Sequence, residues 1–188
     1  MKAVFYTRLF SDADMSIGAK MVYSQLIFRA VICDNESFDT DGIFDIDRAR
    51  VFEDGWCGLD NVQLCQVAFD LNIDPKTVSR TTRKLKELGR INEDNCIFIP
   101  ANIFAQYIEL ITESDLSGWE LLLYSFIWNK TRKYKYVDTY RAKLSDNFGI
   151  SETHLSNLLA SLRSKGYIER KNNGHRWRIF CKNIMDNL

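Results

Sequence analysis

Apolar residues recur at helical spacing in two stretches of the chain, and the second stretch repeats the first. Period-3.6 patterning predicts three helices in each copy. The predicted helices cover residues 17–31, 62–71 and 75–88 in the first copy and 118–128, 139–148 and 152–165 in the second. Ser16 and Ser117 are expected to cap the first helix of each copy. Gly89 and Gly166 follow the third helices, where a left-handed residue is expected to end each one.

The repeat is visible as identities at two fixed offsets. Ser16, Tyr23 and Ser24 recur 101 residues later as Ser117, Tyr124 and Ser125. Further along, the offset is 77, and the pairs are Ile73 and Ile150, Ser79 and Ser156, Leu85 and Leu162, Gly89 and Gly166, and Ile91 and Ile168. The difference of 24 predicts that the first copy carries about 24 extra residues between its first and second helices.

A two-stranded hairpin is predicted after each third helix. In the first copy the strands are 90–92 and 96–99, with the turn at 93–95. In the second copy they are 167–170 and 175–180, with the turn at 171–174. Asn173-Gly174 is a strong hairpin-turn signal. The chain is therefore expected to be mainly α with small β-hairpins (α+β), in two domains, 1–105 and 106–188, linked within 100–112.

The order of helix, helix, turn, helix and hairpin resembles the winged helix-turn-helix family of DNA-binding proteins. The resemblance is carried by residues 72–80 (NIDPKTVSR) with 85–91 (LKELGRI), and by 148–156 (FGISETHLS) with 162–168 (LRSKGYI). It covers both copies except the insertion, and it implies two winged helix-turn-helix domains in tandem. The start of the chain, at residues 5–10 and 15–23, resembles the opening of phage and plasmid replication-initiation modules. That resemblance implies replication initiation or control on a mobile element.

The third helix of the first copy has the chemistry expected of a DNA-contacting helix. Asp74 can cap it, and Pro75 suits its first position. Val78, Leu85 and Leu88 fall on one face, which is expected to be buried. Residues 76–90 contain six basic residues and one acid. Lysine and arginine neutralise phosphates, and arginine also reads guanine edges. The candidate DNA contacts are Lys76, Thr77, Ser79, Arg80, Arg83 and Lys84; the alternative is a solvated helix face.

The second copy distributes its charge differently. Its third helix offers polar candidates, and its basic candidates lie before the second helix and on the hairpin, a pattern that suits phosphate clamping around a polar reading helix. These candidate DNA contacts are Thr153, His154, Ser156, Asn157, Arg132, Lys133, Arg170, Lys171, Arg176 and Arg178. The alternatives are core packing for Trp177 and an ordinary surface histidine for His154. Four leucines, Leu155, Leu158, Leu159 and Leu162, crowd this helix, so some of them are expected to pack on the other domain or a second chain.

The insertion at residues 31–61 contains nine acidic residues, opposed by Arg48 and Arg50. Two interpretations stay open. It is either a solvated loop that insulates the DNA face, or an element that docks a protein partner or a second copy of the chain. Its apolar residues predict that part of it is ordered. They are Phe38, Ile43, Phe44, Ile46, Val51, Phe52 and Trp56.

Other functional classes find little support. Lys+Arg and Asp+Glu both number 25, so the net charge is zero. No catalytic or nucleotide-binding motif is present, and neither an enzyme, a cofactor nor a metal site is expected. The five cysteines have no C-x-x-C spacing, and together with the lack of an apolar run for a membrane span or signal peptide they predict a cytoplasmic protein. Double-stranded DNA is the expected partner; a transcriptional regulator and a protein-docking module are the alternatives.

Overall fold

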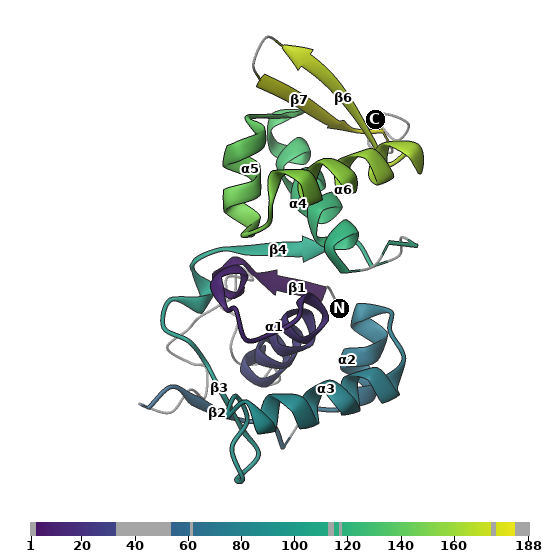
Figure 1. Ribbon diagram of the computed structural model, residues 1–188. Coiled ribbons are helices and arrows are strands. Elements are labelled where there is room, and N and C mark those ends of the chain that lie inside the picture. The colour runs from purple at the N-terminus through teal and green to yellow at the C-terminus, as the bar shows by residue number, and fades with distance from the viewer. Residues whose placement is uncertain are drawn as a thin grey trace, which may run out of the picture. The chain divides into compact units, whose positions relative to one another are not determined.

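A computed structural model describes residues 3–32, 54–60, 62–112, 115–116, 118–173 and 176–182 of the chain. It is an α+β structure that divides into two compact units, Met1–Tyr107 and Ile108–Leu188 (Figure 1). This division falls two residues beyond the boundary expected from the sequence. Each unit contains a long helix, a short strand, two shorter helices and a closing strand or hairpin, in the same order.

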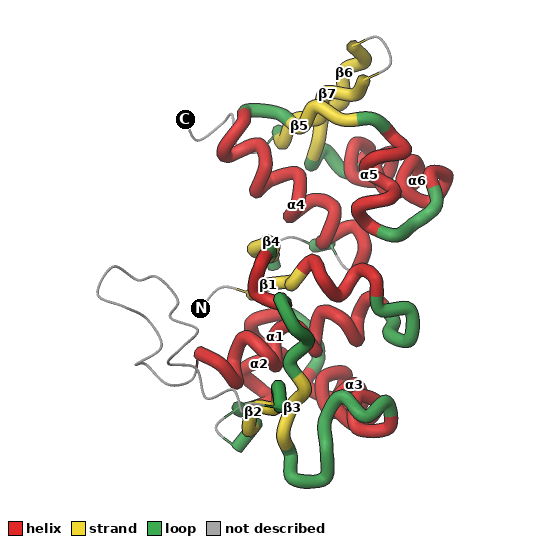
Figure 2. Tube along the Cα trace, turned by 90° about the vertical axis from the view of Figure 1, so that its left-hand side faces the viewer, coloured by secondary structure: helices red, strands yellow, loops and turns green. Residues whose placement is uncertain are grey.

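In the first unit, α1 lies against both shorter helices, and α2 packs on α3. The elements are β1 (Ala3–Tyr6), the 3-10 helix η1 (Thr7–Ser11), α1 (Ile17–Ile32), β2 (Trp56–Gly58), α2 (Leu64–Leu71), α3 (Pro75–Glu87), β3 (Cys96–Phe98) and the 3-10 helix η3 (Ile103–Ala105). The three helices confirm the three expected in this copy. The tube of Figure 2 shows β2 and β3 side by side, close to α1.

The second unit follows the same plan with longer strands. Its elements are α4 (Gly118–Tyr134), β5 (Val137–Thr139), α5 (Arg141–Phe148), α6 (Glu152–Ser164), β6 (Ile168–Asn173) and β7 (Arg176–Cys181), and β4 (Tyr107–Leu110) begins at the boundary between the units. Helix α4 is six residues longer than predicted. Helices α2 and α5 have eight residues each and α3 and α6 have thirteen each, all at the predicted offset of 77.

The predicted hairpin of the first unit is present but short. Ile91 bridges Ile97, the Asn92 amide donates to the Cys96 carbonyl at 2.9 Å, and the Phe98 amide donates to the Arg90 carbonyl at 2.9 Å. Strand β3 also pairs with β2, with Cys57 opposite Ile97, and β2 comes from the end of the insertion. The sequence did not predict this additional strand. Leu88 was also expected to be buried, but it caps the end of α3 and is 36% exposed.

The hairpin of the second unit is confirmed, but its turn is shifted. Strand β6 continues through Lys171, Asn172 and Asn173, where the sequence predicted the turn. The sheet has the order β5-β7-β6, and Ile179 lies opposite both Val137 and Arg170. Strand β5 takes the place of the predicted start of the second helix, because a third strand covers the edge of β7.

The ends of the third helices follow from local chemistry. Asp74 caps α3, and its Oδ1 accepts a hydrogen bond from the Lys76 amide at 2.7 Å, as predicted. Ser151 caps α6 in the same way through the His154 amide. Gly89 and Gly166 have φ angles of +65° and +82°, which confirms the left-handed residue expected after each helix.

A contact between strand and helix is repeated in the two units. The Tyr6 amide donates to Ser24 Oγ at 2.8 Å, and the Ile111 amide donates to Ser125 Oγ at 3.0 Å. Both serines are fully buried. They are also one of the serine pairs that align at the offset of 101, so this identity has a structural role in each unit.

A buried ionic cluster joins α1 to α2. The Asp70 side chain is fully buried and accepts two hydrogen bonds from Arg29, each at 2.7 Å, in a bidentate pair. Gln25 donates a third bond to the same carboxylate, also at 2.7 Å. At the aligned positions the second unit has Lys130, Asn147 and Phe126, so the ionic cluster belongs to the first unit only.

Several sequence predictions fall on residues outside the described ranges. They are the Ser117 cap, the Gly174 turn residue and the greater part of the insertion, residues 33–53. At the end of the insertion, Trp56 is described and lies in β2, with its ring 5.4 Å from that of Phe98. In the described part of the chain, no helix has the length and hydrophobicity needed to cross a bilayer.

Replacing Asp70 should destabilise the first unit strongly. Asp70→Asn removes the charge and leaves Arg29 buried without its partner, so we expect the free energy of unfolding to fall by about 3 kcal/mol. The matched control is Asp146→Asn, an exposed residue of α5, which should change stability by less than about 0.5 kcal/mol. Urea unfolding followed by circular dichroism measures both. Equal stability of the two variants would contradict a structural role for the cluster.

Candidate nucleic-acid interface

The exposed face of α3 is polar and strongly basic. Val78 and Leu85, seven residues apart, are completely buried and fix the helix against its own unit. On the opposite side, Lys76, Arg80 and Arg83 occupy the centre of the face because they follow one another at i, i+4 and i+7. All six candidate residues of this helix are exposed, as predicted: Lys76, Thr77, Ser79, Arg80, Arg83 and Lys84.

The cations of α3 are not neutralised within the described part of the protein. Among the described residues, no carboxylate forms an ion pair with Lys76, Arg80, Arg83, Lys84 or Lys86. Asp74 precedes the helix, but its side chain is occupied as the N-cap. Cations concentrated on one face without partner carboxylates give a positive potential there, which attracts polyanions.

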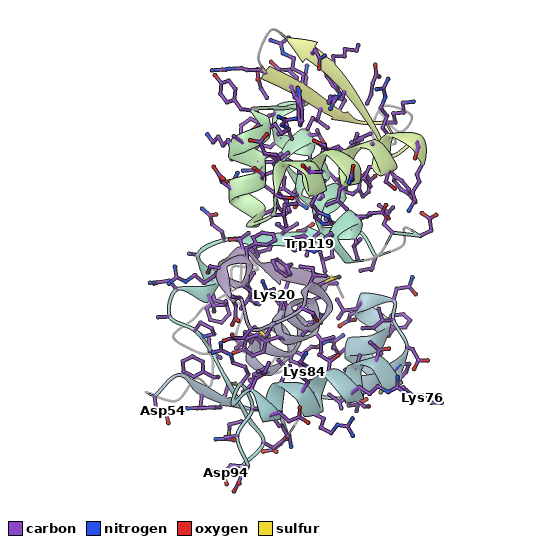
Figure 3. The ribbon with its side chains drawn as sticks, viewed as in Figure 1. Lys20, Asp54, Lys76, Lys84, Asp94 and Trp119 are labelled. Carbon is purple, nitrogen blue, oxygen red and sulfur yellow. The ribbon has the colours of Figure 1, made fainter. Side chains whose placement is uncertain are left out.

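Negative charge is concentrated at the end of the first unit that contains β2 and β3. Asp54, Asp60, Glu93 and Asp94 are all exposed and lie on or beside the turns that flank β2 and β3. Figure 3 shows Asp54 and Asp94 at the strand end of this unit and Lys76 at the far end of α3. The negative field also reaches Cys96, whose thiol pKa is raised by partial burial and by Asp94, Asp60 and Asp54. This acidic edge would repel phosphate groups.

Helix α6 presents a polar but largely uncharged face. All four leucines, Leu155, Leu158, Leu159 and Leu162, are buried. Thr153, His154 and Asn157 are exposed, as predicted, and Ser156 is half-buried. The His154 ring lies 6.2 Å from the ring of Trp119 in an edge contact, so this histidine packs on a neighbour while remaining at the surface.

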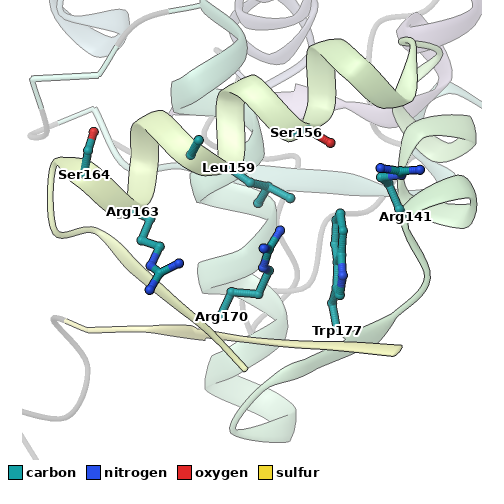
Figure 4. Close-up of a pocket in the computed structure, with 8 residues that line it drawn as sticks. Arg141, Ser156, Leu159, Arg163, Ser164, Arg170 and Trp177 are labelled. Carbon is teal, nitrogen blue, oxygen red and sulfur yellow. The ribbon is translucent and has the colours of Figure 1, made fainter. Parts of the chain in front are cut away.

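A hollow of about 700 Å³ lies between α6 and the β6–β7 hairpin, entirely within the second unit (Figure 4). We call it the α6–hairpin hollow. Its polar and aromatic lining consists of Arg141, Arg163, Arg170, Trp177, Ser156 and Ser164. The Arg170 guanidinium lies over the Trp177 ring, 4.6 Å from its centroid. Arg141 comes from α5 and Arg163 from α6, so three elements supply its three cations.

The two serine hydroxyls of the hollow are engaged with backbone carbonyls of α6. Ser156 Oγ already donates to the Glu152 carbonyl at 2.8 Å, and Ser164 Oγ donates to the Ser161 carbonyl at 2.8 Å. The charged donors of the hollow are therefore the guanidinium groups. Arg141 is paired with Glu152, whereas no carboxylate in the described ranges pairs with Arg163 or Arg170. The hollow is consequently basic.

The other candidate residues of the hairpin lie on the outer face of the sheet. Strand alternation separates Lys171, Arg176 and Arg178 from Arg170. Arg176 stacks on Tyr140 at 4.9 Å and donates to its hydroxyl at 2.8 Å. Arg178 lies over Tyr136 at 5.0 Å, and Lys171 over Phe180 at 5.5 Å. The sequence therefore grouped residues that the structure divides between two faces.

The remaining comparisons with the sequence predictions concern residues of α4, α5, α6 and β7. Arg132 and Lys133 lie in the last turn of α4, where Arg132 stacks on Trp128 at 4.6 Å, and neither lines the hollow. The sequence reasoning missed Arg141 and Arg163. The i+7 spacing of Arg163 from Ser156 was a usable signal, since it places both on one face of α6. Trp177 is half-buried against Arg170 rather than enclosed in the core.

The net charge of zero is the sum of opposite net charges on the two units. The first unit contains 12 Lys+Arg and 16 Asp+Glu, a net charge of −4, because of the acidic insertion. The second unit contains 13 and 9, a net charge of +4. Overall neutrality therefore says little about polyanion binding, because the two basic surfaces are local.

Glu120 fixes the position of α6 on α4. Its carboxylate accepts hydrogen bonds from Lys165 Nζ at 2.7 Å and from Ser161 Oγ. These two hydrogen bonds, of which the one from Lys165 has the larger effect, hold the pKa of Glu120 below its ordinary value. A depressed pKa contributes stability above the unfolded pKa, and that contribution is lost as pH falls through the folded pKa.

The described residues include side chains of metal-ligating types and cysteine thiols. No group of three His, Cys, Asp or Glu side chains there could hold a metal ion. Burial raises the pKa of the Cys181 thiol to about 11, which keeps it protonated and unreactive near neutral pH. Cys65, Cys96 and Cys181 form no disulfide among the described residues.

Replacing Glu120 should remove part of the acid sensitivity of the second unit. Wild type should lose stability on going from pH 5 toward pH 3 as Glu120 is protonated, whereas Glu120→Gln should be less stable at pH 7 and lose less over the same interval. Thermal unfolding at a series of pH values measures the difference. Parallel pH profiles for the two proteins would contradict the role given to this carboxylate.

Comparisons with known proteins give no relative for the chain. No family model, no curated protein and no solved structure matches it. What the two basic surfaces bind is therefore inferred from their own charge, exposure and shape.

Proposed function

We propose that the chain binds double-stranded DNA through two winged helix-turn-helix units in tandem. The observation that carries the proposal is the exposed face of α3, where a row of cations without carboxylate partners in the described ranges stands on a rigid, capped helix. Such a helix has the width to enter a major groove, and its lysines and arginines suit contact with phosphates and guanine edges.

The arrangement of the helices supports a helix-turn-helix interpretation of both units. Helix α2 is followed by a left-handed Asn72, and α3 begins three residues later at Pro75. Helix α5 is followed by a left-handed Gly149, and α6 begins three residues later at Glu152. Turns of three to four residues are characteristic of the DNA-binding motif, in which the second helix contacts the groove.

The second unit would contact DNA by a different balance of groups. Thr153, His154 and Asn157 offer neutral hydrogen-bonding groups on α6, which suit base edges. The basic hollow beside them and the hairpin cations suit backbone contacts. Sequence-specific binding would then combine a cationic helix in one unit with a polar helix in the other.

For the biological role, we propose replication initiation or its control on a plasmid- or phage-like element, with transcriptional regulation as the alternative. A protein-docking role receives support from two features of the first unit, an exposed aromatic side chain and the acidic edge. Phe69 on α2 is 77% exposed, which is unusual for so large an apolar side chain. The acidic edge of the same unit could contact a basic partner.

Replacing one arginine of α3 should weaken DNA binding. Arg80→Ala should lower the affinity for a duplex about tenfold at 0.1 M salt, because it removes a cation from the centre of the exposed face. The matched control is Arg8→Ala, an exposed arginine of η1, which should change affinity less than about twofold. Fluorescence anisotropy with a labelled mixed-sequence duplex gives both values.

The same titration repeated over a range of salt concentrations provides a second criterion. Affinity for the wild-type chain should fall steeply with salt, and the dependence should be shallower for Arg80→Ala. Salt-independent binding, or an equal effect of both substitutions, would favour the docking role instead.

A further inference from the structure

The α6–hairpin hollow has the features of a built anion site. Three arginines from α5, α6 and β6 line one hollow, and in Figure 4 Trp177 stands between Arg170 and Arg141 as an apolar wall. Guanidinium groups bind phosphate oxygens with two parallel N–H donors. The indole is suited to packing against a flat or apolar group attached to that phosphate.

The residues that line this hollow can be compared with the aligned residues of the first unit. At the offset of 77 that aligns the helices, Lys86 corresponds to Arg163, but Glu87 and Glu93 correspond to Ser164 and Arg170. The hairpin of the first unit is also shorter, since Ile91 pairs directly with Ile97, whereas Ile168 pairs with Cys181. Reversed charge and a short hairpin remove both parts of the site from the first unit.

We infer that the α6–hairpin hollow seats a backbone phosphate of nucleic acid, with Arg163 and Arg170 as its donors and the attached sugar against Trp177. This rests on the proposed function, and it deepens it by assigning the two units different tasks. The second unit grips the backbone through its hollow. The first unit, with an acidic edge in place of the hollow, contacts DNA through α3 alone.

The arrangement explains the position of Arg170. Its guanidinium is held over the Trp177 ring, 4.6 Å from the ring centroid, and both side chains line the hollow. Arg163 is exposed and approaches the hollow from α6. Arg141 is partly neutralised by Glu152, so it contributes less to the grip.

Duplex titrations of the full chain test the inference. Arg163→Ala combined with Arg170→Ala should lower affinity about tenfold or more near 0.1 M salt and reduce the slope of log affinity against log salt by about 0.9 for each phosphate that the chain no longer neutralises. The weakening should be uniform across duplexes of different sequence, because a phosphate carries no sequence information. Lys182→Ala, an exposed cation outside the hollow, is the control. Arg163→Lys should retain part of the affinity.

A second measurement separates this inference from the proposed function. Inorganic pyrophosphate is titrated into the ¹⁵N-labelled chain, and the Trp177 indole N–H signal, assigned with Trp177→Phe, is followed. We expect the signal to shift in wild type and not in the double variant. If duplex binds but the double variant behaves like Lys182→Ala, the backbone seat is overturned while DNA binding stands.

The remaining outcomes are equally decisive. If the wild-type chain binds no duplex but pyrophosphate shifts Trp177, the proposed function fails and the hollow is a site for a free phosphate ligand, which overturns its assignment to the backbone. If the double variant loses duplex affinity and the pyrophosphate response together, the backbone seat is supported.

Discussion

Two buried side chains in each of the helices α3 and α6 determine which side chains of these helices are exposed to a ligand. Val78 and Leu85 in α3, and Leu155 and Leu162 in α6, occupy aligned positions and are completely buried. Seven residues is nearly two helical turns, so each pair forms one stripe, and the opposite side of the helix must face solvent. The cations of α3 and the polar groups of α6 are exposed because these stripes are buried.

The two units keep this constraint and differ in almost everything around it. The first joins α1 to α2 by the Asp70–Arg29 pair, whereas in the second an edge contact between the rings of Phe126 and Phe148 links α4 to α5 at 5.3 Å. In the first unit, the cations are concentrated on α3 and the carboxylates lie beside β2 and β3. In the second unit, α6 presents a largely uncharged face, and the cations lie around the α6–hairpin hollow and on the β6–β7 hairpin. One scaffold thus supports two different polar surfaces.

The helices were predictable from the sequence because their signals are local. Apolar spacing, the Asp74 cap and the glycines after α3 and α6 all lie within or next to the element they define. Strands β3, β6 and β7 were predicted as well, but β2 was not. Strand β2 has three residues and pairs with β3 about forty residues later, and its pairing depends on how the chain closes rather than on its own pattern. The α6–hairpin hollow was missed for a similar reason, since Arg141, Arg163 and Arg170 meet only after α5, α6 and β6 have packed.

Arginine footprinting of the full chain with phenylglyoxal, with and without a bound mixed-sequence duplex, tests most directly whether α3 and α6 form the nucleic-acid surface. Both helices and the control site contain exposed arginines, so mass spectrometry of one sample compares them all. The account predicts that duplex protects Arg80 and Arg83 on α3 and Arg163 beside the hollow, and leaves Arg8 reactive. Protection of Arg8 with continued reactivity of Arg80 and Arg163 would contradict it.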